Sequence, residues 1–214
     1  MTVSIDRDGD IALVTVDNPP VNALSQALRQ ALWEAAGTLD ADPDIRAVVL
    51  ICAGRTFIAG ADVTEFGKPP VPPHLPDLVD RIEAAAKPWI AAIHGSALGG
   101  GFEALLSFDH IIAERGSTFG LPEVMFGLFP GMGAHAILSR KLGAAMADRV
   151  ILSNETYSAE QMYDLGIVHQ LAEPGEGMAA VRDFMAKSSR RHAGLIGARR
   201  ASRRANPITL EELR

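Results

Sequence analysis

The stretch from Pro88 to Glu114, PWIAAIHGSALGGGFEALLSFDHIIAE, constrains the fold of this chain more than any other. The apolar run from Trp89 to Ile93 is typical of a strand, and the glycines at 99–101 interrupt it directly before the helix-forming FEALLSF. We therefore predict a strand, a glycine turn, a helix and a second strand. Bare backbone at a helix start lets a ligand approach closely, and its unpaired N–H groups favour negative charge. The stretch thus predicts an oxyanion site.

Two glutamates accompany this predicted site. Glu103 lies three residues after Gly100, in the first helical turn, where it is either a carboxylate favoured by the helix dipole or a catalytic group beside the ligand. Glu123 follows a Gly and a Pro in the otherwise apolar loop STFGLPEVMFGLFPGMG. Apolar surroundings raise the pKa of a carboxyl group by desolvation, which makes Glu a usable acid near neutral pH.

A second turn can also expose backbone N–H groups. We predict a strand over Asp44–Ala53, and the sequence GRTFIAGAD then follows it with the turn Gly60-Ala61-Asp62. The alternative is an ordinary strand-to-helix turn in which Asp62 serves as the cap.

Three segments, FIAGADV, ALGGGFE and FGLPEVMFGLFPGMG, resemble the crotonase superfamily of enoyl-CoA hydratases and isomerases, in the same order. The resemblance extends from about Ile11 to Val168 and implies an α/β fold of ββα units wound into a superhelical spiral. It also implies that the N–H groups of Ala61 and Gly100 bind a thioester oxygen and that Glu103 and Glu123 are the catalytic pair. The further substrate contacts that it implies are Val21, Ala59, Gly60, Asp62 and Gly99; Val21 belongs to VNALS, one residue shorter than the common family segment that lies against the CoA adenine.

The second half of the chain has a closer resemblance. After Gly131 the chain continues MGAHAILSRKLG, where the commonest hydratases carry a Gly-Thr-Gln-Arg-type segment. Together with YSAEQMYDLGIVHQLAEPGEG and ANPITLEEL, the part from about Ser96 to Leu213 is similar to the diffusible-signal-factor synthases. Those crotonases dehydrate a 3-hydroxyacyl carrier-protein thioester and can also hydrolyse it. Three functions therefore stay open: a CoA-dependent hydratase, which we favour, such a dehydratase and thioesterase, and a non-catalytic member retained for binding.

Length and composition bound the remaining expectations. With 214 residues, 48% of them hydrophobic, we expect one crotonase-like domain, with a spiral core at 1–168 and a helical tail at 169–214. The resemblance implies more helix after NPITLEELR, so we expect a shortened C-terminal helical part, either natural or due to truncation. The net charge of −6 argues against nucleic acid as a partner. The sequence shows neither an apolar run of about 18 residues nor a leader, so we expect a cytoplasmic protein that does not enter the membrane.

Cofactors and partners are implied by the resemblance. It requires no redox cofactor and no metal, and coenzyme A enters only as part of the substrate. The expected partners are an acyl-CoA or acyl carrier-protein thioester and further copies of the chain, in a homotrimer or hexamer. The basic segment from Lys187 to Arg204 is either a solvated helix face or a docking surface for CoA phosphates or an acidic carrier protein.

For the other segments we predict secondary structure and structural roles. We predict a hairpin over Val3–Asp17, a helix capped by Ser25 that ends near Leu39, and a helix over Asp77–Ala86. Five prolines between Lys68 and Pro76 favour an extended loop that could serve as a mobile lid. Structural roles are expected for three residues whose side chains invite catalytic interpretations, namely Cys52, His94 and His135.

Overall fold

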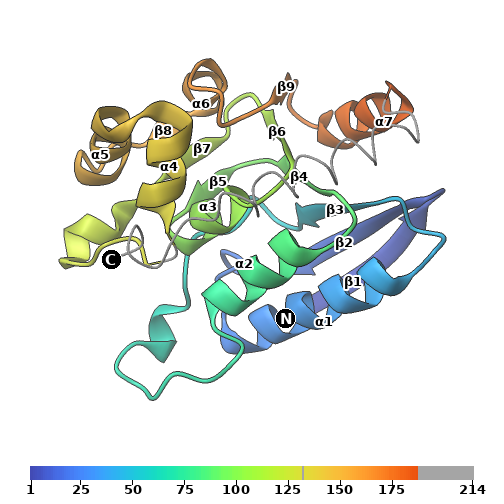
Figure 1. The fold of residues 1–214 in the computed structure, drawn as a ribbon, viewed down its shortest axis with the longest axis horizontal. Coiled ribbons are helices and arrows are strands. Elements are labelled where there is room, and N and C mark those ends of the chain that lie inside the picture. Colours follow the sequence, from blue (N-terminus) through green and yellow to red (C-terminus); the bar gives the residue numbers. More distant parts are fainter. Residues whose placement is uncertain (132, 188–214) are drawn as a thin grey trace.

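A six-stranded sheet organises the residues that this computed structural model describes, 1–131 and 133–187 (Figure 1). Its first two strands form the predicted antiparallel hairpin, and every later strand runs parallel to its neighbour. In spatial order the strands are β1 (Thr2–Asp8), β2 (Ile11–Asp17), β3 (Ala47–Cys52), β4 (Trp89–Ile93), β6 (His110–Glu114) and β9 (Gln170–Ala172).

A smaller sheet contains the second strands of two successive chain units, β5 (Ser96–Leu98) and β7 (Thr118–Gly120), and one further short strand, β8 (Tyr157–Ser158). The chain passes from β4 in the large sheet to β5 in the small sheet and then into helix α3 (Gly100–Leu105), and it likewise passes from β6 to β7. After β3, Ile58 pairs with Ala97 of β5, so this unit follows the same path. The repeated strand, strand and helix confirm the predicted α/β architecture of ββα units.

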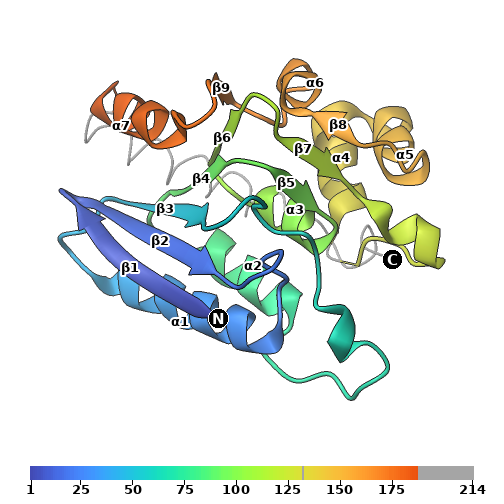
Figure 2. The same ribbon diagram turned by 180° about the vertical axis from the view of Figure 1, so that it is seen from behind.

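Helices cover both faces of the large sheet, which explains why its central strands read as unbroken apolar runs. On one face, α1 (Gln26–Ala41) and α2 (Leu75–Ala84) pack against the β-strands, as the opposite views of Figures 1 and 2 show. On the other face, Val181 and Met185 of α7 (Gly177–Lys187) pack against Ile90 and Ile112. The remaining helices are α4 (Ala134–Leu142), α5 (Ala144–Leu152), α6 (Ala159–Asp164) and the 3₁₀ turns η1 (Val63–Glu65) and η2 (Pro122–Phe126).

The helix that follows the proline-rich loop begins earlier than expected. We predicted it over Asp77–Ala86, but α2 spans Leu75–Ala84. Pro76 fits into its first turn because the first N–H groups of a helix have no intrahelical acceptor, so the missing donor costs nothing there. The backbone N–H of His74 donates a 2.6 Å hydrogen bond to Oδ2 of Asp77, which stabilises this start.

The predicted helical tail also differs in its first residues. Gln170–Ala172 form strand β9, which pairs with β6, and helix begins only at Gly177. The basic segment after Lys187 and the final NPITLEELR lie outside the described residues. Among the helices that are described, none combines the length and apolar character needed to cross a membrane.

Candidate active site

The glycine turn has a backbone conformation that only glycine adopts readily. Gly99, at the start of α3, has φ 51° and ψ −131°. Its N–H donates to the carbonyl of Gly120 at 2.9 Å, and its own carbonyl accepts from the N–H of Glu103 at 2.9 Å. The turn is therefore fixed between the end of β7 and the first turn of α3, and the N–H of Gly100 stands at the helix start.

The two predicted oxyanion donors belong to turns that lie side by side. A Cβ atom placed on Gly100 would lie 3.8 Å from the backbone nitrogen of Ala61. The Ala61 turn is held by Leu24, whose N–H donates to the carbonyl of Gly60 at 2.8 Å. Within residues 1–131 and 133–187, neither the Ala61 nor the Gly100 N–H donates a hydrogen bond to the protein. Both are available to a ligand oxygen.

Glu123 extends its carboxyl group to the glycine turn from η2. A Cβ atom on Gly99 would lie 2.9 Å from Oε1 of Glu123 and 3.6 Å from Cα of Gly60. The other oxygen, Oε2, is buried and has no hydrogen-bond partner among the described residues. Burial raises the pKa of Glu123 above its ordinary value, as the apolar loop predicted. A carboxyl group in this environment holds a proton at higher pH and can deliver it to a ligand.

Glu103 is in the first turn of α3, as expected from its spacing to the glycines. The residue is only 5% exposed, which is rare for a glutamate. Phe102 beside it packs edge-on against Phe119 of β7, with ring centroids 5.6 Å apart, and this contact fixes the helix on the small sheet. The position suits a group that acts on a ligand held at the glycine turn; its catalytic role stays a prediction.

The other predicted contact residues lie around this centre in different ways. Gly60 adjoins Gly99, and the N–H of Ala59 donates to the carbonyl of Val21 at 3.1 Å, so Val21 stands beside the Ala61 turn with its side chain exposed. Asp62 caps η1 by accepting from the N–H of Thr64 at 2.9 Å, and this bond lowers its pKa. The structure therefore favours the capping alternative for Asp62, while the substrate contacts of the five residues stay predictions.

Two leucines at the site were not expected there. A Cβ atom on Gly100 would lie 2.7 Å from Cδ2 of Leu75 and 3.9 Å from Cδ1 of Leu24. Leu75 lies within the segment predicted as a proline-rich loop, and Leu24 directly precedes the predicted helix cap Ser25. The shared signal was their place directly beside the helix starts, because residues that precede or open a helix can face the neighbouring turn.

The residues with expected structural roles make structural contacts. His94 Nε2 lies 3.0 Å from the carbonyl of Gly54, and His135 Nε2 lies 3.0 Å from Oδ1 of Asp148. Cys52 is buried, and burial raises the pKa of its thiol, so it does not supply a thiolate nucleophile. In the described part of the chain no group of His, Cys, Asp and Glu has the arrangement of a metal site.

Comparison with known proteins identifies relatives over nearly the whole chain. The profile of the family described as enoyl-CoA hydratase/isomerase matches residues 6–193. The chain is 39% identical over 199 residues to the peroxisomal bifunctional enzyme of Danio rerio, covering 93% of this chain but only 27% of that protein. It is 34% identical over 208 residues to a probable enoyl-CoA hydratase of Bacillus subtilis, covering 91% of this chain and 80% of the relative. Among solved structures, Pseudomonas aeruginosa DspI matches with a TM-score of 0.84 and 32% identity, over 92% of this chain and 83% of that one.

Proposed function

This chain belongs to the enoyl-CoA hydratase/isomerase family, and from that premise we propose that it adds water to, or removes it from, an acyl-CoA thioester. Membership confirms the crotonase-type fold that the three sequence segments predicted. The observation that carries the proposal is the carboxyl group of Glu123, which lies against the glycine turn with one buried oxygen that has no partner among the described residues.

The thioester oxygen is proposed to accept hydrogen bonds from the N–H groups of Ala61 and Gly100. This idea is supported by the adjacent turns and by the lack of a described protein acceptor for either donor. Addition of water to a 2-enoyl thioester moves negative charge onto that oxygen, so donors fixed there stabilise the transition state. One such donor is worth about a hundred- to a thousandfold in rate.

The two glutamates are proposed to move the protons. Glu103 takes a proton from water as the water oxygen bonds to C3, and Glu123 gives a proton to C2 as the enolate-like charge collapses. In dehydration the roles reverse. The raised pKa of Glu123 supports this division because the acid must be protonated at the working pH. Coenzyme A takes part only as the carrier of the acyl group.

Incubation of the purified protein with crotonyl-CoA tests the proposal. We expect mass spectrometry to show the gain of one water and an intact thioester. Saturated butyryl-CoA serves as the control, because it binds through the same thioester and has no double bond to hydrate. If a series of enoyl-CoA esters of increasing chain length binds but none gains water, the proposed reaction is wrong.

A second candidate function rests on the resemblance of the segment from about Ser96 to Leu213 to the diffusible-signal-factor synthases. Dehydration of a 3-hydroxyacyl carrier protein followed by thioester hydrolysis places charge on the same oxygen, so the same donors would serve both steps. Release of a free enoyl acid from a medium-chain 3-hydroxyacyl carrier protein, with negligible hydration of crotonyl-CoA, would favour this candidate. The pair of glutamates argues against a purely binding role.

The proposed assembly follows from the family resemblance, and the proposed location follows from the sequence pattern. We propose a homotrimer or hexamer in the cytoplasm that acts on acyl thioesters. Light scattering coupled to size-exclusion chromatography tests the assembly: a mass equal to one 22.8 kDa chain at working concentration contradicts it.

A further inference from the structure

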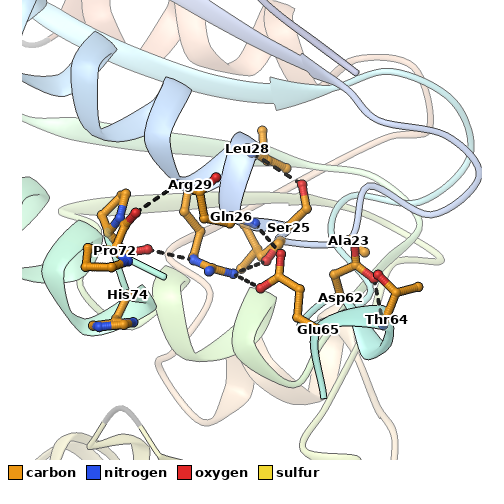
Figure 3. Close-up of polar contacts among 12 residues, drawn as sticks. Ala23, Ser25, Gln26, Leu28, Arg29, Asp62, Thr64, Glu65, Pro72 and His74 are labelled. Carbon is orange, nitrogen blue, oxygen red and sulfur yellow. Dashed lines mark hydrogen bonds and ion pairs between the residues drawn. The ribbon is translucent and has the colours of Figure 1, made fainter. Parts of the chain in front are cut away.

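Arg29 is a charged residue buried in the first turn of α1. It is 7% exposed, and its guanidinium reaches acceptors from three separate segments (Figure 3). Nε donates to the carbonyl of Pro73 at 2.9 Å, and Nη1 donates to the carbonyl of Leu24 at 2.7 Å and to Oε2 of Glu65 at 3.0 Å. A buried charge is costly unless it is paired and hydrogen-bonded, so these contacts explain how the residue is tolerated.

Glu65 completes the connection from the other side. It is the last residue of η1, the turn that follows Ala61 directly. While Oε2 pairs with Arg29, Oε1 accepts from the backbone N–H of Gln26, the first residue of α1, where the helix dipole favours an anion. Figure 3 shows the Glu65 carboxylate between η1 and the start of α1. Both carboxylate oxygens therefore fix η1 to α1.

The partners of Arg29 adjoin the two proposed oxyanion donors. Leu24 pairs with Ala61 as an isolated parallel bridge, and its side chain lies beside Gly100. Pro73 comes two residues before Leu75, the other side chain beside Gly100. Gln26 adds a 2.7 Å hydrogen bond from its side-chain amide to the carbonyl of Pro72. The guanidinium of Arg29 thus holds the two backbone segments that contain Leu24 and Leu75, whose side chains lie beside Gly100.

We propose that Arg29 and Glu65 form a clamp that positions the Ala61 N–H group against the Gly100 N–H group. The inference rests on the proposed function. An oxyanion donor acts only when it lies about 2.7–3.1 Å from the oxygen. A displacement of about 1 Å costs about a hundredfold in rate even when the altered residue lies away from the reacting atoms. Arg29 is a positioning residue because its guanidinium contacts the protein backbone and Glu65.

Arg29→Met tests the clamp because it keeps the length of the side chain and removes all the donors. We expect kcat with crotonyl-CoA to fall about a hundredfold, with KM changed only a few-fold. Arg29→Lys keeps the charge, but a single ammonium does not reproduce the planar fork that reaches three segments, so we expect it to restore only part of kcat. Glu65→Gln keeps the shape and weakens the pairing with Arg29, so kcat should also fall.

A matched control lies at the other end of the large sheet. Arg46 precedes β3 and pairs through Nε with Oδ2 of Asp10 at 2.7 Å, whereas the site follows the carboxyl ends of β3 and β4. Arg46→Met therefore removes a comparable ion pair without touching the turns of the site. It should lower the melting temperature and leave kcat unchanged.

A spectroscopic measurement separates positioning from general damage to the fold. Infrared difference spectra of bound butyryl-CoA, labelled with ¹³C at the thioester carbonyl, report how strongly the two donors polarise that bond. In the wild type the stretching frequency should be lower than for the free ligand, and in Arg29→Met it should return towards the free value. Arg46→Met should keep the wild-type frequency.

The outcomes distinguish the clamp from the proposed reaction. Wild-type kcat and carbonyl frequency in Arg29→Met, or a loss of melting temperature alone, would overturn the clamp. If the wild-type protein lowers the carbonyl frequency of bound butyryl-CoA but hydrates no enoyl-CoA, the proposed reaction is wrong. The frequency shifts of the variants would still test the clamp in that case. If Arg29→Met fails to fold, Arg29→Lys and Glu65→Gln carry the test, and unchanged kcat and frequency in both would refute it.

Discussion

Gly100→Ala should reduce activity and leave stability nearly unchanged. The added Cβ would lie 2.7 Å from Cδ2 of Leu75, the far end of a flexible side chain that can move. Gly100 is the first residue of α3 and, unlike Gly99, is not in the left-handed region of backbone conformation, so alanine brings no strain. Alanine is also favoured over glycine in helices by up to about 1 kcal/mol. These effects offset each other, and we expect the free energy of unfolding to change by less than about 1 kcal/mol.

The loss of activity follows from the space between the donors. The same Cβ would lie 3.8 Å from the Ala61 nitrogen, and we expect it to occupy space that the thioester oxygen needs in the proposed binding mode. A ligand displaced by the methyl group loses at least one donor, which corresponds to a fall of about a hundred- to a thousandfold in kcat/KM.

Gly101→Ala is the control variant, because it should lose stability through overpacking. Its Cβ would lie 2.5 Å from the carbonyl oxygen of Ile58, and this backbone atom is fixed by the N–H of Leu98 at 2.9 Å. Such overpacking costs about 1–3 kcal/mol, and each kcal/mol lowers the melting temperature of a chain of this size by about 2–4 °C. Parallel melting curves and steady-state rates on crotonyl-CoA measure both variants.

One pattern of melting and rate data would contradict this role for Gly100. If Gly100→Ala melts as early as Gly101→Ala while its folded fraction turns over at the wild-type rate, Gly100 is a packing glycine and the assignment of its N–H as a donor is wrong.

Three further predictions concern the acid, the base and the turn. Glu103→Gln and Glu123→Gln should each lower kcat by about a hundred- to ten-thousandfold with little change in butyryl-CoA affinity, measured by calorimetry; near wild-type rates in both would contradict the mechanism. Burial raises the pKa of Glu123 in the folded state, so ionisation of this carboxyl group destabilises the fold. The destabilisation is absent at pH values below the pKa of Glu123 in the unfolded chain and is complete above its pKa in the folded chain. Chemical unfolding should therefore find Glu123→Gln more stable than the wild type at alkaline pH and equal to it below about pH 4; an equal difference at both pH values would exclude this origin. Gly99→Ala should lose rate and about 1–3 kcal/mol of stability, since its Cβ would lie 2.9 Å from Oε1 of Glu123 at φ 51°; wild-type melting would contradict the strain.

Local patterns in the sequence were enough to predict the central unit of the fold. WIAAI forms a fully buried strand because both faces of the sheet are covered, and an unbroken apolar run indicates that situation. The glycine triplet marks the turn because the conformation at Gly99 excludes side chains. The placement of Glu103 follows from helical spacing alone. The fold of the ββα units was available only through the family resemblance.

Features that depend on distant partners were missed. Arg29 and Glu65 meet through the folding of η1 back onto α1, and neither residue carries a local signal of burial, since both types are usually solvated. Strand β9 has only three residues, so its existence depends on the free edge of β6 rather than on its own propensity. The start of α2 was placed two residues late because proline was treated as excluded from helices, whereas the first turn accepts it.

The order of strands in the large sheet bears on how the protein forms as it leaves the ribosome. Spatial order and chain order coincide from β1 through β2, β3, β4 and β6 to β9. Each strand therefore finds its pairing edge already built by the strand synthesised before it, and no later strand has to insert between two earlier ones. The chain can extend its sheet from the amino end during translation, which limits the time for which an unpaired apolar edge is exposed to other chains. The two turns that carry Ala61 and Gly100 would then come together when β5 is added, before the segment that contains Glu123 has been made.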